Sequence, residues 1–171
     1  MSIKRIIHQR ISQLADKWPA LSEKLVASFN PMEMTSIPWS PVTKSLERSK
    51  IALVTTAGIH HSGQKPFDME DSNGDPSFRI IDPHTIEGDY KITHDYYNHS
   101  DADKDLNVVF PITRLKEMHA AGCIGAISEI HFSLMGHIDG GHVKMLINQT
   151  AMQLTRIFKQ LEVDAVLLTP A

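Results

Sequence analysis

Hydrophobic residues recur at helical spacing over the first 29 positions of the chain. One face of a helix over residues 3–18 is apolar, and Pro19 begins a second helical segment that ends at Asn30-Pro31. Two further prolines, Pro38 and Pro41, predict an extended connection. We therefore assign residues 1–49 to an N-terminal helical segment with a proline-containing connection. The apolar face of its first helix comprises Ile3, Ile6, Ile7, Ile11, Leu14, Ala15 and Trp18.

After residue 49 the pattern changes to short apolar runs that alternate with helical stretches. Runs at 50–57, 106–110, 124–130 and 163–169 predict buried strands. Helices are expected from Pro111 to Gly122, with Ile112, Leu115 and Met118 facing the core, and over 142–161. This alternation predicts that residues 50–171 form an α/β domain with an open, mainly parallel sheet and flanking helices, of the Rossmann-like or flavodoxin-like kind.

A long polar segment, 58–106, interrupts this regular pattern. It has no strong periodicity, although short pieces at 78–81 and 91–93 are expected to pair locally. Residues 60–107 hold eleven of the 20 acidic residues but four of the 17 basic ones, together with five of the 10 histidines. Because a loop of this length is uncommon inside a compact domain and usually carries function, we interpret 58–106 as a functional loop.

Composition narrows the class of partner. A net charge of -3 gives no indication of nucleic acid or of an anionic membrane as the partner. No apolar run is long enough to cross a membrane, and the N-terminus lacks the apolar core of a signal peptide. The single Cys123 fits a reducing compartment. We therefore expect a cytoplasmic protein that acts on a small molecule.

Polar side chains follow three of the predicted strands. In open α/β sheets ligands bind beyond the carboxyl ends of the strands. That rule brings together the segments Thr55–His61, Ile130–Ser133 and Thr169–Ala171, of which two carry histidine and all carry serine or threonine. We expect a binding crevice where these three segments meet.

The densest titratable segment is THDYYNHSDADKD, at residues 93–105. Imidazole changes its protonation near neutral pH, and neighbouring carboxylates fix its tautomer and charge. A solvated acidic loop accounts for the aspartates, but it accounts less well for the two histidines and two tyrosines. The segment is therefore a candidate for proton transfer or ligand binding.

Five segments together resemble the selenoprotein B family of the glycine, sarcosine, betaine and D-proline reductases, and most of all its D-proline branch. The resemblance covers about residues 50–171, and HSDADKD followed by FPITRL is its most specific part. The matching segments are ALVTTAGIH (52–60), DPSFRII (75–81), HDYYNHSDADKDLNVVFPITRL (94–115), GAISEIHFSLMG (125–136) and VDAVLLTPA (163–171).

The resemblance implies reductive cleavage of a C–N bond in an amino acid or amine by a selenolate or thiolate. In that family a strand ending in LLTP-like residues leads directly into selenocysteine, so we expect the nucleophile immediately after Ala171. We accordingly expect that the chain stops at a UGA codon and is inactive alone. It would carry no cofactor itself, a partner subunit would supply a pyruvoyl group, and other reductase subunits would join it in a homo- or hetero-oligomer.

The same chemistry suggests roles for individual side chains. Histidines would protonate the leaving amine or stabilise the selenolate, aspartates would orient the rings, Arg79 would hold a substrate carboxylate, and threonines would offer hydroxyl donors. The catalytic candidates are His60, His61, His94, His99 and Asp101, and the substrate-binding candidates are Thr55, Thr56, Arg79, Asp103 and Thr169.

Two other classes of function remain open. The histidines and aspartates of the loop include ligand types for zinc or iron, but no HxH or HExxH spacing accompanies them, and we predict no metal. The alternative without catalysis is an α/β protein that binds a small molecule in the same crevice. A tightly bound metal would favour the first class, and ligand binding without turnover would favour the second.

Overall fold

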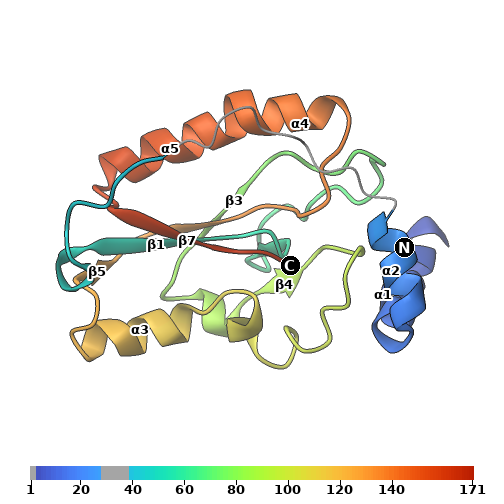
Figure 1. The fold of residues 1–171 in the computed structure, drawn as a ribbon, viewed down its shortest axis with the longest axis horizontal. Coiled ribbons are helices and arrows are strands. Elements are labelled where there is room, and N and C mark those ends of the chain that lie inside the picture. The colour runs from blue at the N-terminus through green and yellow to red at the C-terminus, as the bar shows by residue number, and fades with distance from the viewer. Residues whose placement is uncertain (1–2, 28–38) are drawn as a thin grey trace.

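The computed structural model describes residues 3–27 and 39–171, and its body is a sheet between two layers of helix (Figure 1). Helices α4 (Gly141–Met145) and α5 (Ala151–Gln160) cover one face, joined by a π-helical turn over Leu146–Thr150. Helix α3 (Ile112–Ala120) covers the other face. The predicted α/β class is confirmed.

The sheet is centred on strand β1 (Lys50–Thr55). On one side β1 pairs in parallel with β7 (Ala165–Thr169), and on the other with β5 (Ala126–Ile127) and β6 (His131–Ser133). Strand β3 (Arg79–Ile81) joins the outer side of β6 in the antiparallel sense. The sheet is therefore open and mainly parallel, as predicted.

Alternating side chains of β1 form the two halves of the core. Ile51 and Leu53 pack into the cluster that contains Ile112 and Leu115 of α3. The intervening Ala52 and Val54 pack with Phe132, Leu154 and Phe158 on the α5 face. The period of two in the strand thus matches the two helix layers. The fully buried members of both clusters fix β1 as the rigid centre of the domain.

The strand predicted over 106–110 is wrong. Residues Leu106–Val108 form a 3-10 helix. The carboxylate of Asp105 caps its first turn by accepting the backbone N–H of Asn107 (2.9 Å). Leu106, Val109 and Phe110 are buried while Val108 is 61% exposed. Burial at i, i+3 and i+4 is a helical period, so an apolar run of this length did not identify a strand.

Two other predicted strands differ in detail. The run over 124–130 is reduced to β5, and after a break β6 begins at His131, whose Nδ1 accepts the backbone N–H of Leu53 (2.9 Å). The final strand β7 forms, but it lies at the edge of the sheet and is not buried, with Leu168 69% exposed.

The N-terminal helices form where they were predicted, as α1 (Ile3–Lys17) and α2 (Pro19–Ala27). Their apolar face does not join the core: Ile3, Ile6, Ile7, Ile11, Leu14 and Trp18 are all exposed. Part of the predicted connection, residues 28–38, lies outside the described residues. Met118 is likewise exposed on α3, although its neighbours Ile112 and Leu115 are buried as expected.

The long polar segment contains little regular structure. A short antiparallel pair joins β2 (Ile59–His60) to β4 (Lys91–Ile92), whereas β3 joins the main sheet instead of pairing within the loop. The segment also contains a short 3-10 helix at Ile86–Gly88. Another short 3-10 helix, Leu46–Arg48, lies before β1. No helix in the described part of the chain is both long and apolar enough to cross a membrane.

Candidate functional site

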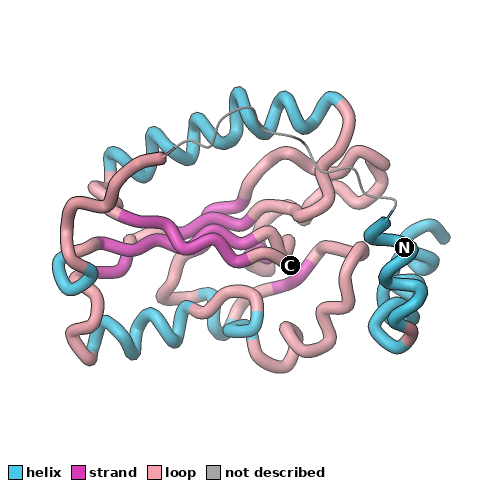
Figure 2. Tube along the Cα trace, in the orientation of Figure 1, coloured by secondary structure: helices cyan, strands magenta, loops and turns pink. Residues whose placement is uncertain are grey.

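The carboxyl ends of β1, β6 and β7 meet at one end of the sheet, as the sequence predicted. Thr55 is the register partner of Ser133 on one side and of Thr169 on the other. Figure 2 shows the loops that follow these strands gathered near the C-terminus. We refer to Thr56, His94, Gly136 and Ala171, which converge there, as the strand-end site.

A network of threonines holds the last residues of β1 and β7. The carbonyl oxygen of Val109 accepts hydrogen bonds from Thr55 Oγ1 (2.9 Å) and Thr169 Oγ1 (2.8 Å). The backbone N–H of Thr56 donates to Thr169 O (3.1 Å), and Ala171 N donates to Thr56 Oγ1 (3.0 Å). The two strand ends are thereby tied to each other and to the segment that precedes α3.

His94 reaches this site from the loop after β4, and its residue is only 3% exposed. Its Nδ1 accepts the backbone N–H of Tyr96 (3.3 Å), so the neutral ring carries its proton on Nε2. That buried Nε2 has no hydrogen-bond partner. Burial, with a smaller contribution from the nearby His137, lowers the pKa of His94 to about 4. His94 is therefore a neutral ring with an unused N–H at neutral pH.

Two glycines allow the His94 loop to approach the strand ends. A β-carbon on Gly136 would lie 2.9 Å from His94 Nε2, 3.0 Å from Ala171 O and 3.3 Å from Thr56 O. Gly58, with φ of +69°, would clash in the same way with the Thr93 carbonyl (2.7 Å). Any larger residue at either position would displace His94 or the end of β7.

Aromatic rings surround His94. Tyr97 meets it edge to face at 5.0 Å between ring centroids, and Tyr96 does so at 5.9 Å. Tyr96 also stacks on His137 at 4.1 Å. The Tyr97 hydroxyl donates to Ala57 O (3.2 Å), and burial raises the pKa of Tyr97 well above its ordinary value. These rings exclude water from the imidazole and hold it in one orientation.

Comparison with known proteins agrees with this arrangement. A family model described as glycine/sarcosine/betaine reductase selenoprotein B matches residues 19–171. The chain belongs to this family.

Its curated relatives are reductase subunits. The D-proline reductase subunit gamma of Acetoanaerobium sticklandii is 38% identical over 131 residues, which cover 77% of this chain and 52% of the relative. The glycine reductase complex component B subunit gamma of Symbiobacterium thermophilum is 29% identical, over 78% of this chain and 31% of the relative. The betaine reductase complex component B subunit beta of Peptoclostridium acidaminophilum is 29% identical over 74% and 29%.

This member of the selenoprotein B family thus spans about half the length of the D-proline relative and less than a third of the glycine and betaine relatives. No solved structure matches the chain. The family match covers every element of the strand-end site, including the His94 loop and β7.

Of the five catalytic candidates, only His94 lies within the strand-end site. His60 is buried with both ring nitrogens bonded, to His61 O (2.8 Å) and Thr93 Oγ1 (2.9 Å). His61 accepts the N–H of Asp82 (3.1 Å), which places it near the start of the next loop. These two rings have structural partners, and their catalytic roles remain predictions.

The acidic candidates face outward on a short turn. His99 Nδ1 contacts Asp103 Oδ2 at 2.7 Å, and Asp101 pairs with Lys104 at 2.8 Å. Both aspartates are exposed, and the Lys104 ammonium lowers the pKa of Asp101. The structure therefore brings His99 and Asp103 together, but it does not bring either of them into contact with His94.

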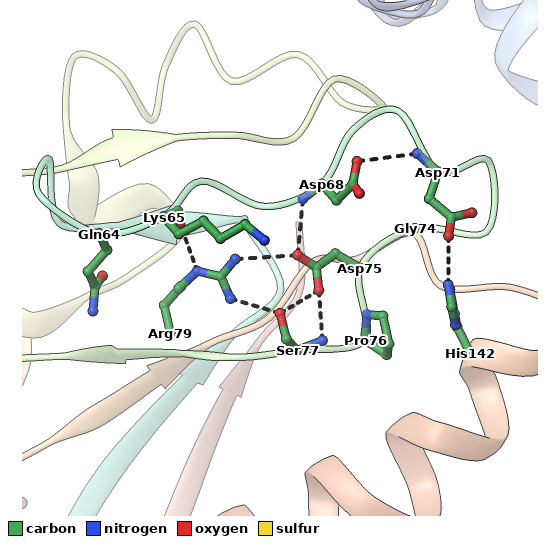
Figure 3. Close-up of a pocket in the computed structure, with 10 residues that line it drawn as sticks. All are labelled: Gln64, Lys65, Asp68, Asp71, Gly74, Asp75, Pro76, Ser77, Arg79 and His142. Atoms are coloured by element: carbon green, nitrogen blue, oxygen red, sulfur yellow. Dashed lines mark hydrogen bonds and ion pairs between the residues drawn. The ribbon is translucent and has the colours of Figure 1, made fainter.

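Arg79 lies in a separate polar pocket of about 490 Å³ (Figure 3). Its guanidinium donates to Lys65 O (2.7 Å) and Pro66 O (2.9 Å), pairs with Asp75 (3.3 Å) and lies over the ring of Phe67 (4.1 Å). A side chain with this many partners holds the loop over 65–79 against β3. The pocket also contains a His142–Asp71 pair at 2.9 Å.

The described residues contain no group of three or more histidine, cysteine or acidic side chains placed to hold a metal ion.

Sequence reasoning missed Gly136 in the site and Val109 beside it. A glycine three residues after the end of β6 was a usable signal for Gly136, because close backbone approach favours glycine there. The part of Val109 that matters is its carbonyl oxygen, which no residue pattern reveals.

Proposed function

We propose that the chain is part of a reductase subunit that cleaves a C–N bond of an amino acid or amine, with a selenolate or thiolate on the residue that follows Ala171. One observation carries the proposal: His94 Nε2 and Ala171 O converge on the same side of Gly136. A residue joined to Ala171 would enter the enclosure that contains the unused N–H of His94. Curated relatives that are reductase subunits support the same class of reaction.

The chemistry requires an ionised, polarisable nucleophile. The lone pair of the nucleophile forms a bond to the α-carbon while the C–N bond breaks, and the amine leaves with the electron pair of the C–N bond and takes up a proton. A thiolate of a dithiol reductant then attacks the selenium or sulfur of the adduct and breaks its bond to carbon, which keeps that electron pair and takes up a proton. The second thiol of the reductant displaces the nucleophile from the resulting mixed bond, so that the selenolate or thiolate is regenerated and the dithiol, which supplied the two electrons, becomes a disulfide.

His94 would act as a neutral hydrogen-bond donor in this scheme. Because burial lowers its pKa to about 4, the ring is not an imidazolium at pH 7 before the nucleophile is present. A hydrogen bond from Nε2 to a selenolate or thiolate favours the charged form of that nucleophile. The same N–H would hold the nucleophile in line with the substrate carbon.

The remaining parts of the enzyme would come from partner subunits. Relatives carry the names of complex components, and we propose that this chain likewise works with other reductase subunits. A pyruvoyl group, if the substrate is captured through its nitrogen, would belong to such a partner. The exposed edge of β7, which pairs with β1 on one side, supports association.

The test uses the chain with a Cys-Gly-Gly extension after Ala171, so that a thiol stands in for the nucleophile. The rate of its reaction with an aromatic disulfide reagent, measured from pH 5 to 10, gives the thiol pKa. We expect His94→Leu to raise that pKa by about one unit or more, because the thiolate loses its donor.

His119→Leu is the matched control, since His119 lies on α3 outside the strand-end site, with its Nδ1 3.4 Å from Ile124 O. It should leave the thiol pKa unchanged, and circular dichroism should show both variants folded. Equal thiol pKa values with and without His94 would sink the proposal.

A further inference from the structure

We propose that Thr55, Thr56 and Thr169 are positioning residues that fix the direction in which the chain leaves β7. This inference rests on the proposed function and deepens it, because the direction of Ala171 would set the position of the nucleophile. The three hydroxyls bind the carbonyl of Val109 and the N–H of Ala171, and Thr55 Oγ1 also accepts the backbone N–H of Ala57 (3.2 Å).

The first part of this arrangement is a shared hydrogen-bond acceptor, the carbonyl oxygen of Val109. Thr55 and Thr169 are register partners on adjacent strands, and their hydroxyls converge on the one carbonyl oxygen of Val109 (2.9 and 2.8 Å). Thr55 is fully buried and Val109 is nearly so. Since a carbonyl oxygen has two lone pairs, both are used, and the 3-10 segment before α3 is fastened to both strand ends.

The second part is a side chain that replaces a backbone acceptor at the end of the ladder. Thr56 N still donates to Thr169 O (3.1 Å), so in a parallel ladder the next donor from this strand is the N–H two residues on, at Ala171. The next backbone donor, Ala171 N, bonds Thr56 Oγ1 instead (3.0 Å). A hydroxyl therefore takes the place of a backbone carbonyl at the last step before the proposed nucleophile.

This arrangement also explains why threonine stands at these positions. The hydroxyl protons of Thr55 and Thr169 already go to Val109 O, so they are not available to a substrate carboxylate in this state. A valine would fill nearly the same volume and keep the β-branched shape that suits a strand. The hydroxyls are thus used for position, and only a change that removes them should reveal their role.

Position matters strongly for a displacement reaction. Nucleophile and carbon must approach to about 3–3.5 Å with aligned orbitals, and a misplacement of about 1 Å can cost about 100-fold in rate. Loss of the Thr56 hydroxyl would free the Ala171 amide, while His94 would stay in place through its own bond to Tyr96 N. We therefore expect Thr56→Val to change the rate of thiolate reaction without changing the thiol pKa.

The first experiment measures hydrogen exchange of the Ala171 amide by NMR in the chain as it stands. Thr56→Val should speed that exchange at least tenfold, and Thr56→Ser, which keeps the hydroxyl, should restore protection. Thr155→Val is the matched control, because its hydroxyl bonds Ala151 O on the exposed side of α5. For the other two threonines, the double variant T55V/T169V should shift the Val109 carbonyl ¹³C resonance upfield.

The second experiment uses the Cys-Gly-Gly extension and separates the two proposals. Thr56→Val should lower the thiolate rate constant at least fivefold at unchanged thiol pKa, with rescue in Thr56→Ser. Unchanged Ala171 exchange, or equal effects of valine and serine, would overturn the positioning role even if the His94 effect persists. Loss of the His94 effect with Ala171 still protected would overturn the proposed function instead.

Discussion

His94 and His131 are two buried histidines with the same hydrogen-bonding pattern. In each ring Nδ1 accepts a backbone N–H, from Tyr96 for His94 and from Leu53 for His131. In each ring Nε2 is buried without a partner. Burial is the largest cause that lowers each pKa to about 4. By protonation alone the two rings cannot be told apart.

Their surroundings differ. His131 lies within the sheet, fully buried, where its ring replaces a backbone acceptor for β1 and meets Phe110 edge to face. His94 lies on a loop beside Gly136 and Ala171, at the ends of the parallel strands. A lowered pKa therefore reports burial, and only location separates a histidine that completes a core from one that faces the proposed reaction site.

The largest expected effect is on the pH dependence of the free energy of unfolding, to which His94 and His131 should contribute equally. Each folded pKa of about 4 lies below the ordinary 6.5, so the unfolded chain binds more protons between these values. The free energy of unfolding should be greatest above pH 6.5 and should decrease as the pH is lowered. Near pH 4 the loss should approach about 3 kcal/mol per ring. Urea unfolding at pH 7.5, 5.5 and 4.5 measures it. If the single variants H94L and H131L each lose as much free energy of unfolding between pH 7.5 and 4.5 as the unchanged chain does, neither ring contributes to the pH dependence.

Substitution at pH 7.5 should separate the two rings. His131→Leu removes the acceptor for Leu53 N in the middle of the sheet, and should lower the free energy of unfolding by about 2 kcal/mol. His94→Leu leaves the half-buried Tyr96 N–H near the surface, and should cost less than about 1 kcal/mol. Urea unfolding decides, and an equal or reversed ranking would contradict the structural role of His131.

A smaller effect should follow from changing the neighbour of one ring only. Gly136→Ala places a methyl group against His94 Nε2 and Ala171 O, which should cost about 1 kcal/mol and loosen the enclosure. The pKa of His94, followed by ¹³C NMR of the ring, should then rise toward 6.5 while that of His131 stays near 4. Gly63→Ala, at a position with open space around it, is the control. A pKa of His94 that does not move would show that Gly136 does not seal the ring.

The elements with strong periodicity were predictable, and the exceptions have physical causes. The β1 strand and the helices α1, α2, α3 and α5 match their patterns. The strand predicted over 106–110 did not form because Asp105 caps a 3-10 turn and Val108 faces outward, which the four apolar residues of this run do not reveal. The prediction of burial was wrong for α1 and β7, because their apolar faces have no covering layer among the described residues.

The sequence by itself determined the class of fold, the strand ends that meet, and the family to which the chain belongs. These follow from periodicity, from the geometry of parallel sheets and from contiguous motifs. Only the tertiary structure shows that, of the five candidates, His94 lies at the strand ends, and that the threonine hydroxyls bond Val109 and Ala171. Such choices depend on which nitrogen is already bonded and which carbonyl lies nearby, and both are set by contacts between residues far apart along the chain.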